Sequence, residues 1–547
     1  MSIQTHSPSV SAEPRAAGLL SHWRWALQRL RQNPNPVWIR ELKQSARLSR
    51  TPVILAVVTG MATLLIASVG GVLSVTAEPA QVGIGVFHTF FSLAFSIVTA
   101  VGPAVAAATI ASEKSGHTWE ALLLTGLTPA GIARGKFLAA LTYVLSYVVM
   151  LAPVGGLSFL FGGVAPAEVL LAFLLLGLIA ALSVAFGLAM SSKFVSPAAA
   201  ILVTLLVALP LAGLAYGLGG VALSFAAHEL WPGVTAGAPV WLPTAYVRAD
   251  FGPSYLVFLL AWPLLVTALP SWLFYEVTIA NMAGASDDRS TRLRLWMLVS
   301  GPALGGAGLL AARSLHDFDW LLVAIGVCWA FSVLLAFLVA GEPLGPSPRV
   351  EKRWATSGVG RVRRWLGPGV GRAGLAAAAI ALLTICGTSA AGAGLAKSRD
   401  QVHALLAFAG YAAAFSVFLV GFCVWARSRA NASAVPRVLG LGALFVALLG
   451  PYIVLAIAGI LAEGGERMLL LAAPSPAFAF VMVQRLQMAG GDADLFSLAG
   501  GSAAIGWALL GVGLLVAGSM RAKRRWLTAR VERALVPAAP GDAPPPA

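Results

Sequence analysis

The stretch AEVLLAFLLLGLIAALSVAFGLAM, residues 167–190, decides the fold class of this chain. Its only charged residue is Glu168, at its start. A helix of this length rises about 36 Å, which is enough to cross about 30 Å of hydrocarbon. Strands of a membrane barrel would be shorter and would alternate apolar with polar residues. The length and composition of the stretch therefore predict a membrane-spanning helix.

Comparable apolar runs recur through most of the 547 residues, which are 58% hydrophobic and 11% charged. Soluble globular chains have about 25% charged residues, so the composition excludes a soluble enzyme. We expect an all-α, polytopic integral membrane protein. Its transmembrane helices number about twelve, at roughly 53–76, 84–110, 137–161, 167–190, 198–224, 254–280, 295–312, 319–340, 373–396, 402–425, 438–461 and 495–519.

The distribution of basic residues predicts the orientation of these spans. If the N-terminus is cytoplasmic, 31 of the 37 Lys and Arg fall in inner segments, while the acidic residues divide equally. The net charge of +15 then separates into +20 inside and −5 outside. Lys and Arg are enriched in cytoplasmic loops. We therefore expect both termini in the cytoplasm and a lipid bilayer, not a nucleic acid, as the partner of these charges.

The expected spans divide the chain into five regions. They are a cytoplasmic N-terminal arm (1–52), a six-helix membrane domain (53–280) with an inner loop at 111–136 and an outer loop at 225–253, a cytoplasmic connector (281–294), a second six-helix membrane region (295–519), and a basic, then Pro/Ala-rich, cytoplasmic tail (520–547). Whether the second region is a degenerate repeat of the first stays open.

The expected spans contain almost no charge. Asp319, the first residue of the eighth span, is the only Lys, Arg or Asp that they include, whereas intramembrane charges normally mark proton relays or ion sites. This argues against a pump driven by protons or sodium through a buried carboxylate. The His and Cys residues show no metal-ligand spacing, and no serine-nucleophile elbow is present. We therefore expect no metal, no catalytic residue and no cofactor bound by this chain.

The N-terminal arm contains NPVWIRELKQSARLSR, residues 35–50. Asn35 can cap a helix whose first residue is Pro36, a position that needs no backbone N–H. Apolar and cationic side chains then fall on different faces, which predicts an amphipathic helix in the inner membrane interface. The residues that carry this prediction are Trp38, Arg40, Glu41, Leu42 and Lys43.

The inner loop contains SEKSGHTWEALLLTGLTPAGIARGK, residues 112–136. Gly126 breaks a first short helix, and Thr128 can cap a second one. Trp119, Leu122 and Leu123 share one face of the first helix. We expect this apolar face to be exposed to the cytosol, where it requires the membrane surface or a groove on another protein.

Both segments resemble a known family, the permease subunits of type-2 ABC exporters. The loop after span 2 in that family often reads E-x-E-x-G-T-x-E-x-L-L-x-T-P-L-S-x-x-x-I-x-x-G-K, and the arm often reads N-P-V-x-x-K-E-L-R. The resemblance covers roughly residues 33–280. The loop departs from the pattern at Ser115, which replaces the second Glu, at His117, which replaces Gly, and at Gly126, which replaces Pro.

The resemblance implies that the inner loop is a coupling helix that fits a groove on a separate ATPase subunit. On this interpretation Trp119, Leu122, Leu123 and Leu127 fill the groove, Glu113 and Glu120 pair with cations at its rim, and Lys136 anchors span 3 at the lipid headgroups. The remaining motif positions are Thr118, Thr125 and Pro129.

ATP would bind to the partner subunit. A Walker A loop needs G-x-x-x-x-G-K-[ST]. The nearest match here, Gly131 to Phe137, lacks one spacer residue and has Phe in place of the hydroxyl. The resemblance also implies a location in the inner (plasma) membrane of a bacterium. It is compatible with a homo- or heterodimer of permeases and with a twelve-span chain that acts as a fused pair.

Two other functions remain open from the sequence. One is a polytopic membrane enzyme or lipid-modifying transferase, for which His228, Glu229 and Asp250 in the outer loop are candidates without recognisable spacing. The other is a non-catalytic scaffold. The inner loop can also be read as an amphipathic segment that only stabilises the bundle. The transport subunit is the preferred prediction because both the arm and the inner loop resemble the permease family.

Overall fold

The computed structural model describes residues 34–46, 50–232, 234, 242–284, 286–358, 360–461, 466–488 and 492–535. Within these ranges the chain is almost entirely helical and contains no β-strand. Twelve helical segments are long and apolar enough to cross a membrane. The chain is therefore an all-α, multi-pass membrane protein, as predicted. The predictions for residues 1–33, 47–49 and 536–547 lie outside the described residues.

The first half contains six of the twelve spans together with the arm. Its helices are α2 (Pro36–Ala46), α3 (Arg50–Thr76), α4 (Pro79–Ser115), α5 (Trp119–Leu124), α6 (Pro129–Met150), α7 (Ala152–Leu160), α8 (Pro166–Ser191), α9 (Pro197–Leu214), η1 (Ala215–Gly219), α10 (Gly220–Leu230), α11 (Leu242–Arg248), α12 (Pro253–Tyr255), η2 (Leu256–Ala261) and α13 (Trp262–Met282).

The second half contains the other six spans and two short helices in its largest inner loop. Its helices are α14 (Thr291–Leu315), α15 (Phe318–Ala340), α16 (Pro348–Thr356), α17 (Arg361–Trp365), α18 (Val370–Gly392), η3 (Ala393–Leu395), α19 (Arg399–Arg429), α20 (Ala434–Leu461), η4 (Glu466–Ala472), α21 (Phe478–Gln487) and α22 (Ala493–Leu535).

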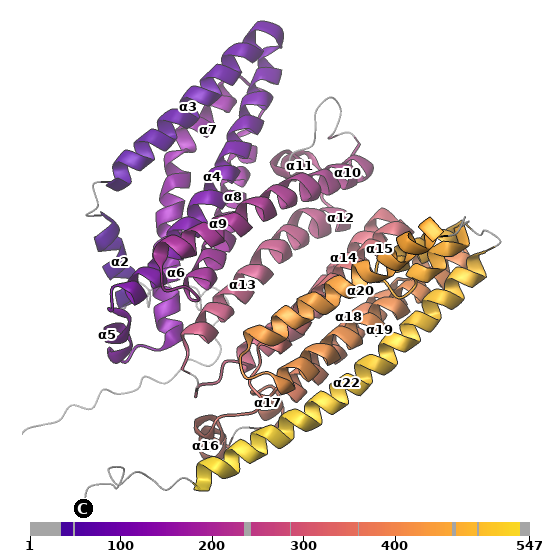
Figure 1. Cartoon of the computed structure of the whole chain (residues 1–547). Coiled ribbons are helices and arrows are strands. Elements are labelled where there is room, and N and C mark those ends of the chain that lie inside the picture. Colours follow the sequence, from indigo (N-terminus) through magenta and orange to yellow (C-terminus); the bar gives the residue numbers. More distant parts are fainter. Residues whose placement is uncertain are drawn as a thin grey trace, which may run out of the picture.

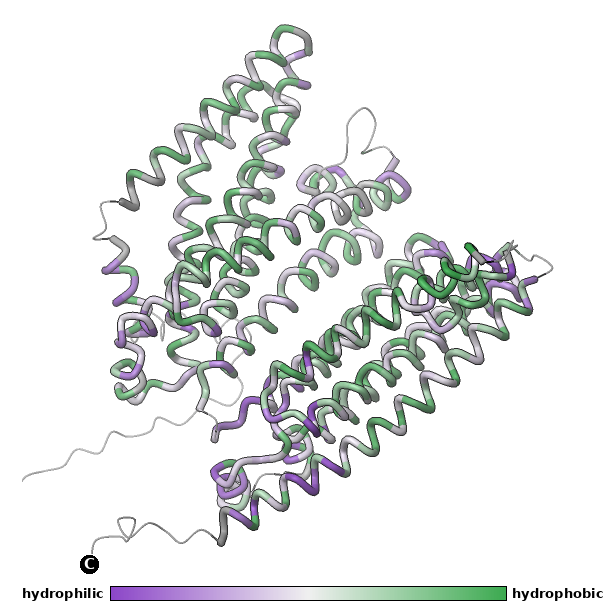
Figure 2. Tube along the Cα trace, viewed as in Figure 1, coloured by the Kyte–Doolittle hydropathy of each residue, from purple (hydrophilic) through white to green (hydrophobic). Residues whose placement is uncertain are grey.

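The two halves form two helix bundles, each with a large core of its own, and a smaller core joins η2 of the first half to α14 of the second (Figure 1). In the first, α4 packs along α8; in the second, α19 lies at the centre and packs against α15, α18 and α22. The bundles meet where α13 contacts α14, and there the Trp296 indole N–H donates to the Leu269 carbonyl (2.8 Å). Hydrophilic residues gather at the helix ends, with apolar stretches between them (Figure 2).

Small residues let the central helices touch through their backbones. A Cβ atom added at Gly511 of α22 would lie 2.5 Å from the Phe418 backbone nitrogen of α19, and one added at Gly421 would collide with the Gly511 carbonyl. In the first half, a Cβ at Gly187 would collide with Pro103 of α4. Since lipid provides no hydrophobic force between helices, such close packing is what holds membrane bundles together.

Two predicted boundaries are wrong because helical structure continues past the membrane. Span 12 was expected to end at residue 519, but α22 continues to Leu535 through a basic stretch whose Arg, Lys, Ala and Leu favour helix. The inner loop was expected to hold two short helices. It holds only α5, since the second, capped by Thr128 (Gly131 N to Thr128 Oγ1, 3.1 Å), is the first turn of the long α6.

Candidate functional site

The arm and the inner loop, predicted separately from the sequence, form a single structural unit. Asn35 joins them through both ends of its amide. Its Oδ1 accepts from the Val37 backbone N–H (3.0 Å), which caps α2 as predicted, and its Nδ2 donates to the Gly131 carbonyl on α6 (2.8 Å). The first turn of α2 is therefore fixed to the first turn of α6.

Gly135 allows α2 to lie directly on α6. A Cβ atom there would be 2.6 Å from both the Asn35 Oδ1 and the Val37 Cβ atoms, which is closer than side chains approach one another. Val37 is only 3% exposed in this contact. Farther along, the Trp38 indole N–H donates to Thr142 Oγ1 on α6 (3.3 Å). The Gly of the Gly-Lys pair in the loop motif is thus the position at which the arm packs.

Lys136, the other member of that pair, lies at the centre of a buried ion network (the arm network: Arg40, Glu41, Glu113 and Lys136). Its Nζ atom is 3.1 Å from Glu41 Oε1 on α2 and 3.0 Å from Glu113 Oε2 on α4. Arg40 pairs with Glu41 at 3.0 Å and also contacts Glu113. Four charges thus connect α2, α4 and α6.

The side chain of Lys136 is fully buried, so the prediction that it anchors span 3 at the headgroups is wrong. The prediction that Glu113 pairs with cations on a partner is also wrong, because its carboxylate is 11% exposed and pairs with Lys136 and Arg40. Spacing in the sequence could not show this, since the pairing residues lie 73 and 95 positions apart.

The electrostatics of the arm network favour the charged form of Glu41. Its burial alone would raise the pKa of this carboxyl, but the Lys136 ammonium and the Arg40 guanidinium outweigh burial, and the pKa falls below its ordinary value. Two carboxylates and two cations balance one another, which is the condition under which charges are tolerated away from water.

The turns on either side of α5 each contain one residue with a left-handed backbone conformation. His117 has a φ of 55° and Gly126 a φ of 75°. The left-handed region favours glycine, so the family's Gly at the position of His117 fits this geometry. The Thr118 backbone N–H donates to the Glu113 carbonyl (3.0 Å), and the Leu122 N–H to the Thr118 carbonyl (3.1 Å). These bonds attach the start of α5 to the end of α4.

The apolar face of α5 points into its own bundle. Leu122 is 5% exposed, and Trp119 and Leu127 are half-buried against the first-half core. The prediction that Leu122 is exposed to the cytosol is therefore wrong, because this side chain is buried in the first-half core. The side chain of Leu123 lies outside the described residues.

The opposite face of α5 is open. Leu124 is 87% exposed, and Glu120, Ala121 and Thr125 are exposed beside it. These four residues form what we call the α5 ridge. Pro129 is half-buried at the start of α6; on the arm, Leu42 is half-buried and Lys43 is exposed. The side chains that can meet a partner thus lie on the face of α5 opposite to the apolar side chains expected to do so.

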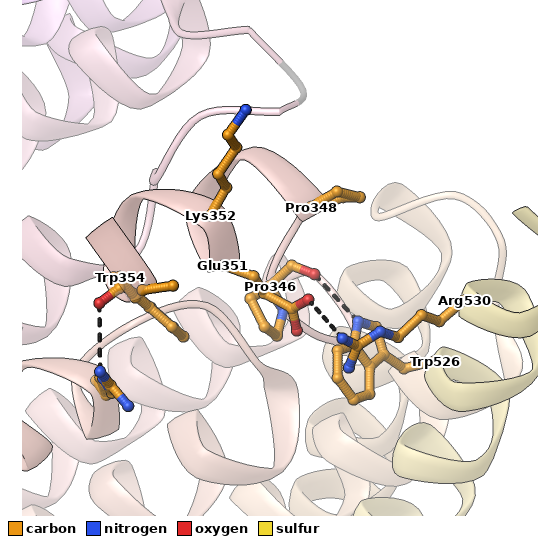
Figure 3. Close-up of a pocket in the computed structure, with 9 residues that line it drawn as sticks. Pro346, Pro348, Glu351, Lys352, Trp354, Trp526 and Arg530 are labelled. Carbon is orange, nitrogen blue, oxygen red and sulfur yellow. Dashed lines mark hydrogen bonds and ion pairs between the residues drawn. The ribbon is translucent and has the colours of Figure 1, made fainter. Parts of the chain in front are cut away.

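A second inner-face feature is a cleft of about 730 Å³ between α16 and the inner end of α22 (Figure 3). The Trp526 indole N–H donates to the Pro346 carbonyl (3.1 Å), and Arg530 pairs with Glu351 (3.3 Å). Trp354 lies on the other side of the cleft, where its carbonyl accepts from Arg364 (3.2 Å). The cleft contains no residue predicted as a site residue.

The outer-loop candidates are not brought together. His228 and Glu229 are exposed at the end of α10, Asp250 is exposed after α11, and no hydrogen bond or ion pair joins Glu229 or Asp250 to another described residue. Instead, Arg248 of the same loop pairs with the buried Glu168 (3.2 Å) at the start of α8. No group of three or more metal-ligating side chains occurs in the described part of the chain.

Compared with protein-family models and with curated protein sequences, the chain matches none.

Proposed function

We propose that this chain is the permease subunit of an ATP-driven ABC transporter, an exporter in the inner (plasma) membrane of a bacterium. A separate ATPase subunit would dock on α5 and hydrolyse the ATP. The observation that carries the proposal is the single unit formed by the arm and the inner loop. Both segments resemble the same permease family, and they bind each other through Asn35, Gly135 and the arm network.

This unit is built to transmit force from α5 into the membrane. The N-terminal end of α5 hydrogen-bonds to the end of α4, and the buried Leu122 side chain fixes one face of α5 to the bundle. Lys136 then ties α4 to α6 and to the arm. A displacement of α5 by a partner would therefore move two spans together, as chains of packed side chains and ion pairs transmit motion between sites.

The surface that would meet the ATPase is the α5 ridge. Leu124 supplies an exposed apolar side chain for the centre of a groove, and Glu120 supplies a carboxylate for its rim. Apolar anchors in a polar surround are the usual core of a protein interface. The chain offers one ridge of this kind, so two copies, or a second permease, would serve the two ATPases that close on ATP.

The experiment is a pull-down of any ABC-type ATPase whose gene lies beside that of this chain, with ATP-dependent transport measured in parallel. Leu124→Asp is expected to reduce ATPase binding at least tenfold, because it places a charge in a desolvated interface. The matched control is Val362→Asp on α17, which is 75% exposed in the largest inner loop of the other half and should bind normally. Undiminished binding and transport in the Leu124 variant would overturn the proposal.

A further inference from the structure

Several spans end at the same corner on the inner face, around Ser192. The Lys114 ammonium, from the end of α4, donates to the Ser192 carbonyl (2.6 Å). The Asn281 amide, from the end of α13, donates to the Ser192 hydroxyl (2.7 Å). Lys193 follows directly and is exposed. Two lysines therefore lie where α4, α8 and α13 leave the membrane.

Two arginines reach the same corner from the connector and the second half. Arg289 donates to the Gly284 carbonyl (3.1 Å) and the Ala283 carbonyl, just after α13. Arg437, on the first turn of α20, places its guanidinium against Gly341 after α15. The next residue, Glu342, accepts a hydrogen bond from Ser290, the neighbour of Arg289 (2.6 Å). We call Lys114, Lys193, Arg289 and Arg437 the seam cluster.

Nearby carboxylates do not neutralise the seam cluster. Asp287 pairs with Arg349 (3.1 Å). Asp288 accepts from the Ser290 and Thr291 backbone N–H groups, at 3.0 and 3.1 Å, and Glu342 pairs with Arg294.

The side chains of Lys193 and Arg437 make no hydrogen bond or ion pair with any residue that the structure describes. Two cations therefore stand at this corner without a counter-ion from the described chain.

The four cations also act on one another. Burial lowers the pKa of Lys193, and Arg437, Arg289 and Lys114 lower it further through repulsion. Like charges held together at the edge of a low-dielectric bundle destabilise it unless an anion lies among them. The charge of the corner thus favours a negative ligand.

The surroundings indicate which anion fits. Val195, two residues after Lys193, is 63% exposed, and Val438, next to Arg437, is 69% exposed. Leu439 is exposed beside it. A ligand at this corner can therefore meet the cations and, beside them, exposed apolar side chains. A phospholipid has these two parts in this order, and basic pockets between spans on the inner side bind anionic headgroups.

We propose that the seam cluster binds the phosphate of an anionic phospholipid from the inner leaflet, with its acyl chains against Val195 and Val438. The site joins the end of α8 in the first half to the start of α20 in the second, so a bound lipid connects the two bundles. This inference does not depend on the proposed transport function.

The test uses the purified full chain in detergent, titrated with short-chain phosphatidylglycerol, phosphatidylcholine and inorganic phosphate. Phosphatidylglycerol is expected to bind at least tenfold more tightly than either of the others. Lys193→Gln with Arg437→Gln is expected to weaken it about 25-fold, at about fivefold for each cation removed. Neither side chain has a partner in the described structure and the four cations repel one another, so without lipid the variant should melt at or above the wild-type temperature.

The control is Lys523→Gln with Arg524→Gln, a pair of exposed cations on the inner part of α22. It should bind phosphatidylglycerol as the wild type does. Equal binding of phosphatidylcholine, or unchanged binding in the Lys193 and Arg437 variant, would overturn the proposal. Binding of inorganic phosphate as tight as that of phosphatidylglycerol would show that the cluster binds a free anion instead of a lipid.

Discussion

Lys136 illustrates how a single buried charge can organise a cytoplasmic element. It stands near the inner end of α6, where a lysine ordinarily extends toward the headgroups. Here it is fully buried because Glu41 and Glu113 approach it from two other helices. A buried pair of this kind contributes little net stability compared with apolar packing, but its disruption is costly since it leaves carboxylates without their partner.

Replacing Lys136 by Met should therefore detach the arm. We expect a loss of about 3 kcal/mol in stability, because Arg40 remains as the only cation for two carboxylates. The measurement is the thermal unfolding midpoint in detergent, together with the rate of chymotryptic cleavage after Trp38 in the arm, a site that neither variant removes. The control is Lys43→Met, at an exposed position of α2. It should change neither the unfolding midpoint nor the cleavage rate. Equal behaviour of the two variants would contradict the role of the arm network.

Acid should release the arm by the same route. The folded-state pKa of Glu41 is lowered from 4.5, so its ion pairs contribute stability at and above that pH, and the contribution is lost as the pH falls through the lowered value. Release can be measured as the amount of tryptic fragments from the arm after preincubation at each pH, or as the extent of labelling of a cysteine introduced at Val37. Either quantity should be constant from neutral pH down to about 5 and increase below 4.5. Release that begins near neutral pH would exclude Glu41 as its cause.

At the level of elements, the α19–α22 crossing determines whether the second bundle closes. α19 is the most buried of the twelve spans. In its most apolar stretch 78% of the residues are buried, against 6% in that of α20. Its glycines differ in role along the helix. Gly421 touches the backbone of α22, whereas no atom lies within 4 Å of a Cβ atom added at Gly410.

Alanine at these two positions should have effects of opposite sign. Gly421→Ala should cost about 1–3 kcal/mol, since the added methyl group meets the Gly511 carbonyl, which cannot move without its helix. Gly410→Ala should be neutral or stabilising by up to about 1 kcal/mol, because alanine favours helix over glycine. Unfolding midpoints of the two variants in the same detergent test this. A stable Gly421 variant would show that the helices lie farther apart.

For the molecule as a whole, the sequence predicts the number of spans well, because apolar length and charge-free composition are local properties. Even the Gly- and Ala-rich segments at 295–312 and 373–396 correspond to α14 and α18. The sequence does not predict which way the apolar face of α5 points. Periodicity identifies residues that share a face, but the element that covers that face, here the bundle around Leu122, depends on tertiary packing. The buried pairing of Lys136 was missed for the same reason.

The predicted orientation can be tested by thiol labelling. In a background with Cys328, Cys386 and Cys423 replaced by Ala, a cysteine introduced at Lys397 should react with an impermeant reagent in intact cells. One introduced at Ser357, which is also exposed, should react only after permeabilisation. The physical reason is the excess of Lys and Arg in the segments assigned to the inner side. The reverse pattern would invert the assignment of every loop.

The length of α22 has a mechanical consequence. Its 43 residues rise about 65 Å, roughly twice the thickness of the hydrocarbon core. The part beyond residue 519 is a lever about 24 Å long, and a tilt of about 10° in the membrane moves its tip by about 4 Å. Because the lever forms one wall of the cleft opposite α16, small rotations of the second bundle are magnified there into changes of width (Figure 3). A pair of fluorophores across this cleft would report the conformational state of the bundle.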